Sequence, residues 1–71
     1  MKSDCVVGVI GLGYVGLPLA CAFAKKYKVK GLDININRIE RLNQYKDDTL
    51  EITTSELEEV VADDVASWIK G

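Results

Sequence analysis

Three glycines in the turn Gly11-Leu12-Gly13-Tyr14-Val15-Gly16 have the spacing of a phosphate-binding loop. A phosphate needs N–H donors and a positive potential with little bulk nearby, and the start of a helix supplies the donors and the potential. Gly11 permits a tight turn, Gly13 lets phosphates approach the backbone, and Gly16 lets a helix pack closely on the preceding strand. The pattern therefore predicts a pyrophosphate site beside Gly11, Gly13, Tyr14, Val15 and Gly16.

An acid follows this turn at the distance that a nucleotide site requires. Asp33 lies 33 − 11 = 22 positions after Gly11 and ends the strand-like run Lys28–Leu32. A carboxylate at this spacing accepts hydrogen bonds from the adenosine ribose and repels the 2′-phosphate of NADP, so Asp33 favours NAD over NADP. Arg38 tempers this preference, because an arginine nearby can pair with a 2′-phosphate; it can equally flank the adenine or be solvated.

The elements that must position these residues follow in the order strand, turn, helix, strand. Cys5–Ile10 is a continuous β-branched run, which predicts a strand inside a parallel sheet with helices on both faces. Tyr14–Tyr27 is apolar nearly all round and predicts a helix. The order predicts an α/β fold, a partial Rossmann arrangement (βαβα plus a C-terminal helix) with parallel strands.

Two further helices are expected after the second strand. Asn35 is the expected N-cap of the first of them, which would bury Ile36, Ile39 and Leu42, and residues 43–49 read as a polar loop.

The last helix is expected to begin at a capping box and to run to the C-terminus. The box can be Thr53 with Glu56 or Ser55 with Glu58, and Gly71 would be the stop. The helix is predicted from an apolar stripe that consists of Leu57, Val60, Val61, Val65, Trp68 and Ile69.

Length and composition limit the number of domains and the kinds of partner that the chain can have. The chain has 71 residues and a net charge of −2 with mixed signs, so we expect one small domain and no nucleic-acid or anionic-membrane partner. No stretch approaches the ~20 apolar residues of a membrane span. Histidine is absent and no metal-ligand cluster is visible. Cys5 and Cys21 lie in apolar surroundings; a disulfide is an alternative, but we interpret them as buried reduced thiols and expect a cytoplasmic location.

The run Val9–Ala20 resembles the N-terminus of the UDP-glucose/GDP-mannose dehydrogenase family. Within that family it is most similar to the UDP-N-acetylhexosamine 6-dehydrogenases that make precursors of surface polysaccharides. The resemblance continues through Gly31–Asn35, Arg38 and Asp48–Ile52, and it covers roughly residues 5 to 59.

The resemblance implies a cofactor and a set of site residues. Members of the family oxidise a sugar C6 alcohol to a carboxylate in two NAD-dependent steps. The pyrophosphate turn carries over onto the three glycines, ribose binding onto Asp33, and a position near the adenosine onto Arg38. Thr49 and Glu51 match a loop near the cofactor; the alternative for these two is an ordinary polar loop.

The resemblance also implies parts that this sequence lacks. In the family, the catalytic cysteine, with its lysine and asparagine helpers, follows in later domains, and Cys5 and Cys21 are better interpreted as core residues. We therefore expect residues 1–71 to be the N-terminal part of a dinucleotide-binding domain, with the catalytic and sugar-binding domains absent. Such a chain would bind NAD or its ADP-ribose part but would not catalyse alone.

Two alternatives stay open. The chain can be a stand-alone interaction module that kept the fold and lost the reaction, or the start of a flavin-binding domain, since the glycine pattern is shared. With few strands, the edge of the first strand would be open, and exposed apolar edges drive self-association. We therefore expect a homodimer or a higher homo-oligomer.

Overall fold

The computed structural model describes residues 5–71, so the first four residues of the expected domain lie outside the described part. The chain forms three strands: β1 (Val6–Ile10), β2 (Lys28–Asp33) and β3 (Ala66–Lys70). They pair in the order β1-β2-β3, and both pairings are parallel. The expected partial Rossmann arrangement with parallel strands is therefore confirmed.

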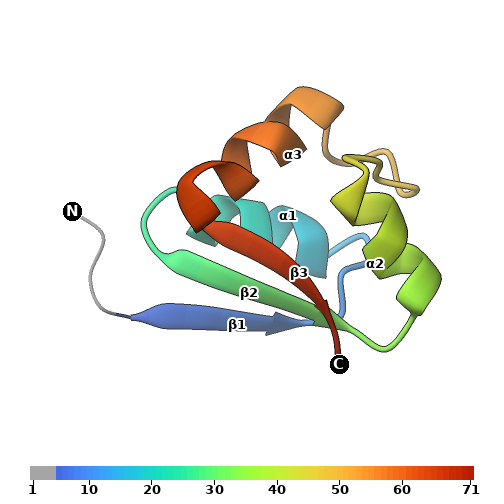
Figure 1. The fold of residues 1–71 in the computed structure, drawn as a ribbon, viewed down its shortest axis with the longest axis horizontal. Coiled ribbons are helices and arrows are strands. Elements are labelled where there is room, and N and C mark those ends of the chain that lie inside the picture. Colours follow the sequence, from blue (N-terminus) through green and yellow to red (C-terminus); the bar gives the residue numbers. More distant parts are fainter. Residues whose placement is uncertain (1–4) are drawn as a thin grey trace.

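The helices connect the strands and lie together on one side of the sheet (Figure 1). They are α1 (Gly16–Phe23), α2 (Ile36–Asn43) and α3 (Thr54–Val61), followed by the short 3-10 helix η1 (Ala62–Asp64). Helix α1 packs on β1 and β2, α2 packs on β2 and β3, and α3 packs on α1 and β3. None of the helices in the described residues is long and apolar enough to cross a membrane.

Local sequence signals set the starts of two helices as predicted. The Asn35 side chain accepts hydrogen bonds from the backbone amides of Asn37 and Arg38, so it is the N-cap of α2. The Thr53 hydroxyl accepts from the amide of Glu56, which selects the first of the two expected caps for α3.

The expectation that the last helix continues to the C-terminus is wrong. Helix α3 ends at Val61, and Asp63 and Asp64 take positive φ angles of 56° and 58°, which a helix cannot continue through. Residues 66–70 then form β3, with Ala66 and Trp68 buried and Ser67, Ile69 and Lys70 exposed. The apolar residues of this segment match the helical and the strand periods at once, and pairing with β2 decides between them.

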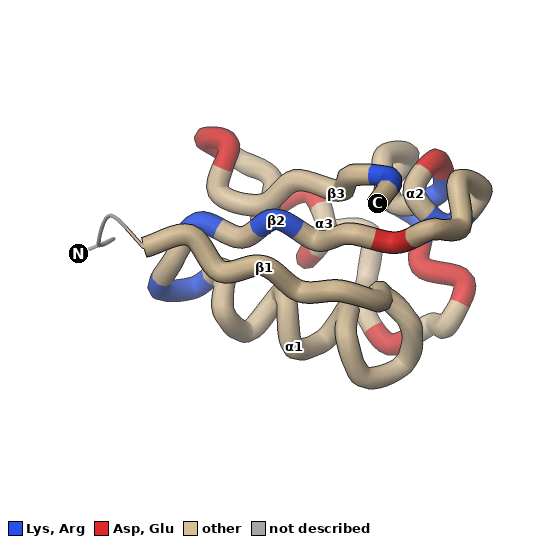
Figure 2. Tube along the Cα trace, turned by 90° about the horizontal axis from the view of Figure 1, so that it is seen from below, with Lys and Arg blue, Asp and Glu red and all other residues tan. Residues whose placement is uncertain are grey.

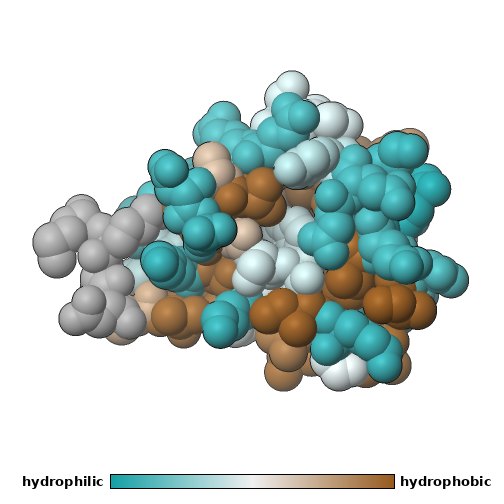
Figure 3. Space-filling model, viewed as in Figure 1, coloured by the Kyte–Doolittle hydropathy of each residue, from teal (hydrophilic) through white to brown (hydrophobic). Residues whose placement is uncertain are grey.

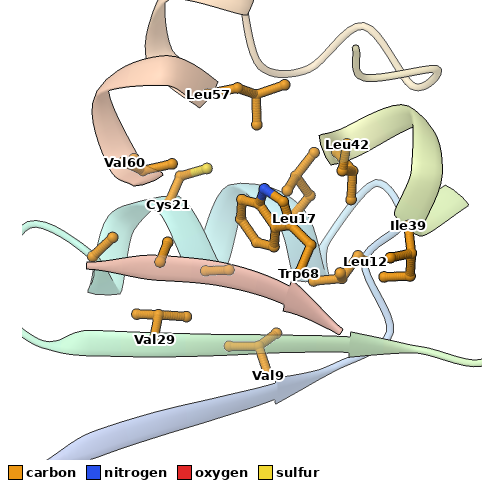
Figure 4. Packing of buried hydrophobic residues seen from close by; sticks show 13 residues of the cluster. Val9, Leu12, Leu17, Cys21, Val29, Ile39, Leu42, Leu57, Val60 and Trp68 are labelled. Atoms are coloured by element: carbon orange, nitrogen blue, oxygen red, sulfur yellow. The ribbon is translucent and has the colours of Figure 1, made fainter. Parts of the chain in front are cut away.

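The hydrophobic core lies between the sheet and the helices (Figure 4). Trp68 from β3 lies over Gly31 of β2, where a Cβ would come within 2.7 Å of the indole ring. Glycine at this position therefore makes room for the largest core side chain. The largest fully buried side chains come from the glycine turn, the helices and β2: Leu12, Leu17, Leu42, Leu57, Val29 and Cys21.

The opposite face of the sheet carries no helix among residues 5–71. Figure 2 shows this face with the strands in front of the helices. Val6 and Ile10, which point away from the helices, are 53% and 87% exposed, so within residues 5–71 helices cover one face of the first strand and not the two faces predicted from the sequence. Cys5 is exposed as well, and only Cys21 is the core thiol that we expected.

Candidate functional site

The glycine turn connects the carboxyl end of β1 to α1 and is anchored to β2. The amide of Gly11 donates to the carbonyl oxygen of Leu32 at 2.8 Å, and Gly11 has a φ of 88°, which favours glycine. A Cβ on Gly16 would lie 1.7 Å from the carbonyl oxygen of Gly11, so α1 packs on the turn closely enough to exclude any side chain there. These two glycines build the turn.

Gly13 differs from both of these glycines because the space beside it is open. An ideal Cβ at Gly13 meets no atom within 4 Å. The start of α1 beside it has no side-chain cap and no acid in its first turn, so the positive end of the helix dipole is not compensated there. In the first turn of α1, the amides of Leu17 and Leu19 donate to the carbonyl oxygens of Gly13 and Val15, and Pro18 has no N–H. The donors for a ligand would therefore be the amides of the turn before Leu17. The open space, the amides and the potential fit a pyrophosphate.

Asp33 lies at the carboxyl end of β2 and joins the glycine turn to the start of α2. Its Oδ2 accepts the amide of Leu12 and its Oδ1 accepts the amide of Asn35, both at 2.9 Å. These two backbone hydrogen bonds, from Leu12 first, lower the pKa of Asp33 below its usual value, so the carboxylate is ionised at neutral pH. Each oxygen has a further lone pair with which it can accept a ribose hydroxyl.

Arg38 on α2 is not solvated. It is only 9% exposed, and its Nε donates to the carbonyl oxygen of Leu12 at 2.7 Å. Its Nη1 lies 2.9 Å from Oδ1 of Asp47, a contact with the distance of an ion pair but not the angle of a hydrogen bond. The guanidinium therefore connects the glycine turn to the loop after α2.

Asp47 is the centre of that loop. Its Oδ1 accepts the amide and the hydroxyl of Thr49, at 2.9 and 2.6 Å, and its Oδ2 accepts the amides of Glu51 and Ile52. Burial raises the pKa of Asp47, but these hydrogen bonds and the Arg38 guanidinium outweigh it and lower the pKa to about 2. Asp47 is therefore a buried anion that sets the conformation of residues 47–52.

Two open pockets meet at the glycine turn. One, of about 410 Å³, is lined by Gly13, Tyr14, Asp33, Asn35, Asn37, Arg38, Asp48 and Thr49. The other, of about 630 Å³, follows the edge of β1 and is lined along the turn by Gly11, Gly13, Tyr14, Val15 and Gly16. Of the nine expected binding residues, eight line one of these pockets, and Glu51 lines neither.

The sequence reading missed Asn35 as a pocket residue, and it also missed Asn37, Asp47 and Asp48. The only local signal for Asp47 is a threonine two positions later, a pattern in which an aspartate accepts a nearby amide. Its pairing with Arg38, nine positions earlier, carries no signal in the sequence. Which of the pocket residues contact a ligand stays a prediction.

The fold and the turn define a dinucleotide-binding domain: parallel strands, an open glycine at a helix start, and an acid at the end of the next strand. Residues 5–69 match the NAD-binding domain of the UDP-glucose/GDP-mannose dehydrogenase family. The chain belongs to this family, and the cofactor of the domain is NAD.

Individual relatives agree with the family match. The chain is 57% identical over 57 residues to UDP-N-acetyl-D-glucosamine 6-dehydrogenase of Pseudomonas aeruginosa, which covers 80% of this chain and 14% of the relative. It is 45% identical over 56 residues to UDP-N-acetyl-D-mannosamine dehydrogenase of Yersinia pestis, or 78% of this chain and 13% of the relative. The resemblance to the UDP-N-acetylhexosamine dehydrogenases is therefore confirmed, and the chain spans about one seventh of their length.

A solved structure shows the same fold. The UDP-glucose dehydrogenase of the archaeon Pyrobaculum islandicum superimposes with a TM-score of 0.78 at 28% identity. The superposition covers 93% of this chain and 16% of the archaeal chain.

Proposed function

We propose that this chain supplies the ADP-binding part of the NAD site of a nucleotide-sugar 6-dehydrogenase. One observation carries the proposal: the Asp33 carboxylate is held by the amide of Leu12 beside the open position of Gly13. A ligand with a ribose and a pyrophosphate would fill both places. The similarity to UDP-N-acetylhexosamine dehydrogenases supports a UDP-sugar as the substrate of the complete enzyme and a role in polysaccharide biosynthesis.

We further propose that these 71 residues do not oxidise a sugar on their own. Cys21 is 1% exposed, and burial, with the charges of Glu56 and Asp47, raises its pKa to about 11. A protonated thiol is a poor nucleophile. Cys5 precedes the amino end of β1, at the opposite end of that strand from the glycine turn. The domain would bind the cofactor without reacting with the sugar. We also propose a cytoplasmic location, which the buried thiol of Cys21 supports.

Calorimetry with NAD and ADP-ribose tests the binding proposal. The parent chain should bind both. Gly13→Val fills the space for the pyrophosphate and Asp33→Ala removes the acceptor for the ribose, so each should weaken binding at least about tenfold. Val6→Thr, on the uncovered face, is a control that should leave the affinity unchanged. Absence of binding by the folded parent at millimolar ligand would contradict the proposal. A lone half-site is expected to be weak, because it lacks contacts that immobilise the rest of the ligand.

A second proposed function is self-association through the edge of β1 that pairs with no strand among residues 5–71. The side chains of β1 carry no charge, as Figure 2 shows. Two copies paired antiparallel about Gly8 would place Val6 opposite Ile10 of the second copy, and Val7 opposite Val9 of the second copy. Every pair except the central glycines is apolar, so the edge is complementary to itself.

The pocket along β1 also supports a second copy of this chain as the partner. Apolar residues of α1 border it, Leu19 and Phe23 among them, and Leu19 is 46% exposed. In a two-fold pair both α1 helices would lie on the same side of the joined sheet, and these residues would meet across the axis. Figure 3 shows hydrophobic residues reaching the surface along the lower side of the molecule, where Figure 1 places β1.

Sedimentation tests this pairing. The parent should sediment as a dimer or larger at tens of micromolar, and Gly8→Lys should be a monomer because two lysines would meet at the axis. The space beside Gly8 is open, so the monomer accommodates the side chain. Ser67→Lys, exposed on β3, adds the same charge away from this edge and should remain associated. A folded, monomeric parent would overturn the proposal.

A further inference from the structure

The pocket beside Asp33 contains a positive charge that a ligand cannot reach. Arg38 lines this pocket, but its Nη1 and Nη2 atoms have almost no exposed surface, and Nη2 has no hydrogen-bond partner among the described residues. An arginine at the rim of such a pocket would normally attract a 2′-phosphate. Here its donors would have to leave their present position to do so.

Two contacts hold the guanidinium in place. The carbonyl oxygen of Leu12 accepts from Nε at 2.7 Å, and Oδ1 of Asp47 lies 2.9 Å from Nη1. The first contact fixes where the group lies, and the second also neutralises its charge. Removing the carboxylate would leave a buried cation with spare donors, an arrangement that is costly unless the cation moves towards water or an anion.

Asp47 is itself fixed independently of Arg38. The four hydrogen bonds from Thr49, Glu51 and Ile52 come from its own loop, and its side chain is fully buried. The loop therefore presents a carboxylate of defined position to α2. The side chain of Asp47 has no exposed surface, and Asp47 does not line the pocket beside Asp33. Any effect it has on binding must therefore act through the groups that it holds, Arg38 and Thr49.

We propose that Asp47 is a specificity-determining positioning residue of the dinucleotide site. By holding and neutralising Arg38, it keeps the pocket beside Asp33 suited to a ribose with a free 2′-hydroxyl and unsuited to one with a 2′-phosphate. The proposal rests on the proposed binding function and adds a residue that acts on selectivity from behind the pocket wall.

The selectivity test compares Asp47 with an exposed aspartate that lies outside the candidate site. Asp47→Asn and Asp63→Asn each remove one negative charge, but Asp63 is exposed in η1, before β3, and lines neither pocket at the glycine turn. Calorimetry with ADP-ribose and 2′-phospho-ADP-ribose gives the ratio of their affinities for each chain. Asp47→Asn should shift this ratio towards the 2′-phosphate by about tenfold, the effect of one released charge-assisted contact. Asp63→Asn should shift it by less than about threefold, as expected for an exposed charge away from the pocket.

A second readout needs no ligand. The Nε–H signal of Arg38 in a proton–nitrogen NMR spectrum should be protected from exchange in the parent and in Asp63→Asn, and should lose that protection in Asp47→Asn. Thr49→Val removes only the hydroxyl donor to Asp47 and should give a smaller change in the same direction. This milder variant keeps the test valid if Asp47→Asn does not fold.

The outcomes separate the two proposals. If the parent binds ADP-ribose but the ratio is unchanged in Asp47→Asn, or changes equally in Asp63→Asn, the specificity role is overturned. If the parent binds neither ligand, the binding function fails, and specificity fails with it. Persistent protection of the Arg38 signal in Asp47→Asn would overturn the positioning role whatever the ligands do.

Discussion

Two aspartates in this small domain accept backbone amides in similar ways but have opposite surroundings. Asp33 accepts two amides at the carboxyl end of the central strand and faces a pocket. Asp47 accepts three amides and a hydroxyl, contacts a guanidinium, and is 7% exposed. The first is arranged to accept a ligand, and the second is arranged to support the wall behind it. Their difference teaches that exposure decides whether such a carboxylate serves binding or architecture.

The largest expected effect separates the two acids by stability. Asp47→Ala would leave Arg38 as an uncompensated buried charge and should destabilise the fold by about 3–5 kcal/mol, enough to unfold a domain of this size. Asp33→Ala should cost about 1 kcal/mol, because water can replace its hydrogen bonds at the pocket. Urea unfolding followed by circular dichroism measures both variants, and equal losses would contradict the division of roles.

The glycines provide the same contrast within the turn. Gly16→Ala places a Cβ 1.7 Å from the Gly11 carbonyl oxygen and should destabilise by about 3 kcal/mol or more. Gly13→Ala enters open space and should change stability by less than about 1 kcal/mol. A comparable unfolding midpoint for the two variants would show that α1 does not need its close contact with the turn.

Lowering the pH should reduce the stability of the fold more through the buried Asp47 than through the half-buried Asp33. The pKa of Asp47 is about 2 when folded, against about 3.9 when unfolded. The contribution of Asp47 to the free energy of unfolding is therefore fully present above pH ~4. It is lost as the pH falls towards 2, a loss on the order of 2 kcal/mol. The lowered pKa of Asp33 acts in the same direction.

The measurement is the urea midpoint between about pH 5 and pH 2. In Asp47→Asn most of the pH dependence should disappear, whereas Asp33→Asn should retain most of it. A parallel decline in the parent and in Asp47→Asn would assign the acid sensitivity to other carboxylates.

The smallest effect is expected from the exposed ion pair beside the buried one. Arg41 and Asp48 lie 2.9 Å apart with about half of each side chain exposed. Arg41→Ala should change stability by less than about 1 kcal/mol, because water screens this pair. A loss as large as that from Arg38→Ala would mean that burial does not distinguish the two pairs.

The sequence predicted much of the candidate site because its parts are local. The glycine turn, the strand before it and Asp33 at the end of the next strand are spaced by rules of backbone geometry that hold in any context. The caps at Asn35 and Thr53 were found for the same reason, since each bonds within three residues of itself. Arg38 was found as a residue near the site, but its burial was not.

The parts that the sequence did not reveal depend on distant partners. Residues 66–70 are apolar at spacings that suit a helix and a strand, and their partners on β2 lie 66 − 29 = 37 positions away. The uncovered face of the sheet was also missed, because the apolar residues of β1 gave no indication of which side the helices would take.

By itself, the sequence determined a dinucleotide-binding unit: a strand, a glycine turn, a helix, a second strand and an acid, in an order that sterics and hydrogen bonding permit in few ways. Only the tertiary structure decided that the C-terminal segment is β3, that Trp68 lies over Gly31, and that Arg38 pairs with Asp47. The physical reason is that glycine sterics and helix caps act between near neighbours. Strand pairing and the burial of a charge gain their stability only when the chain has brought distant residues together.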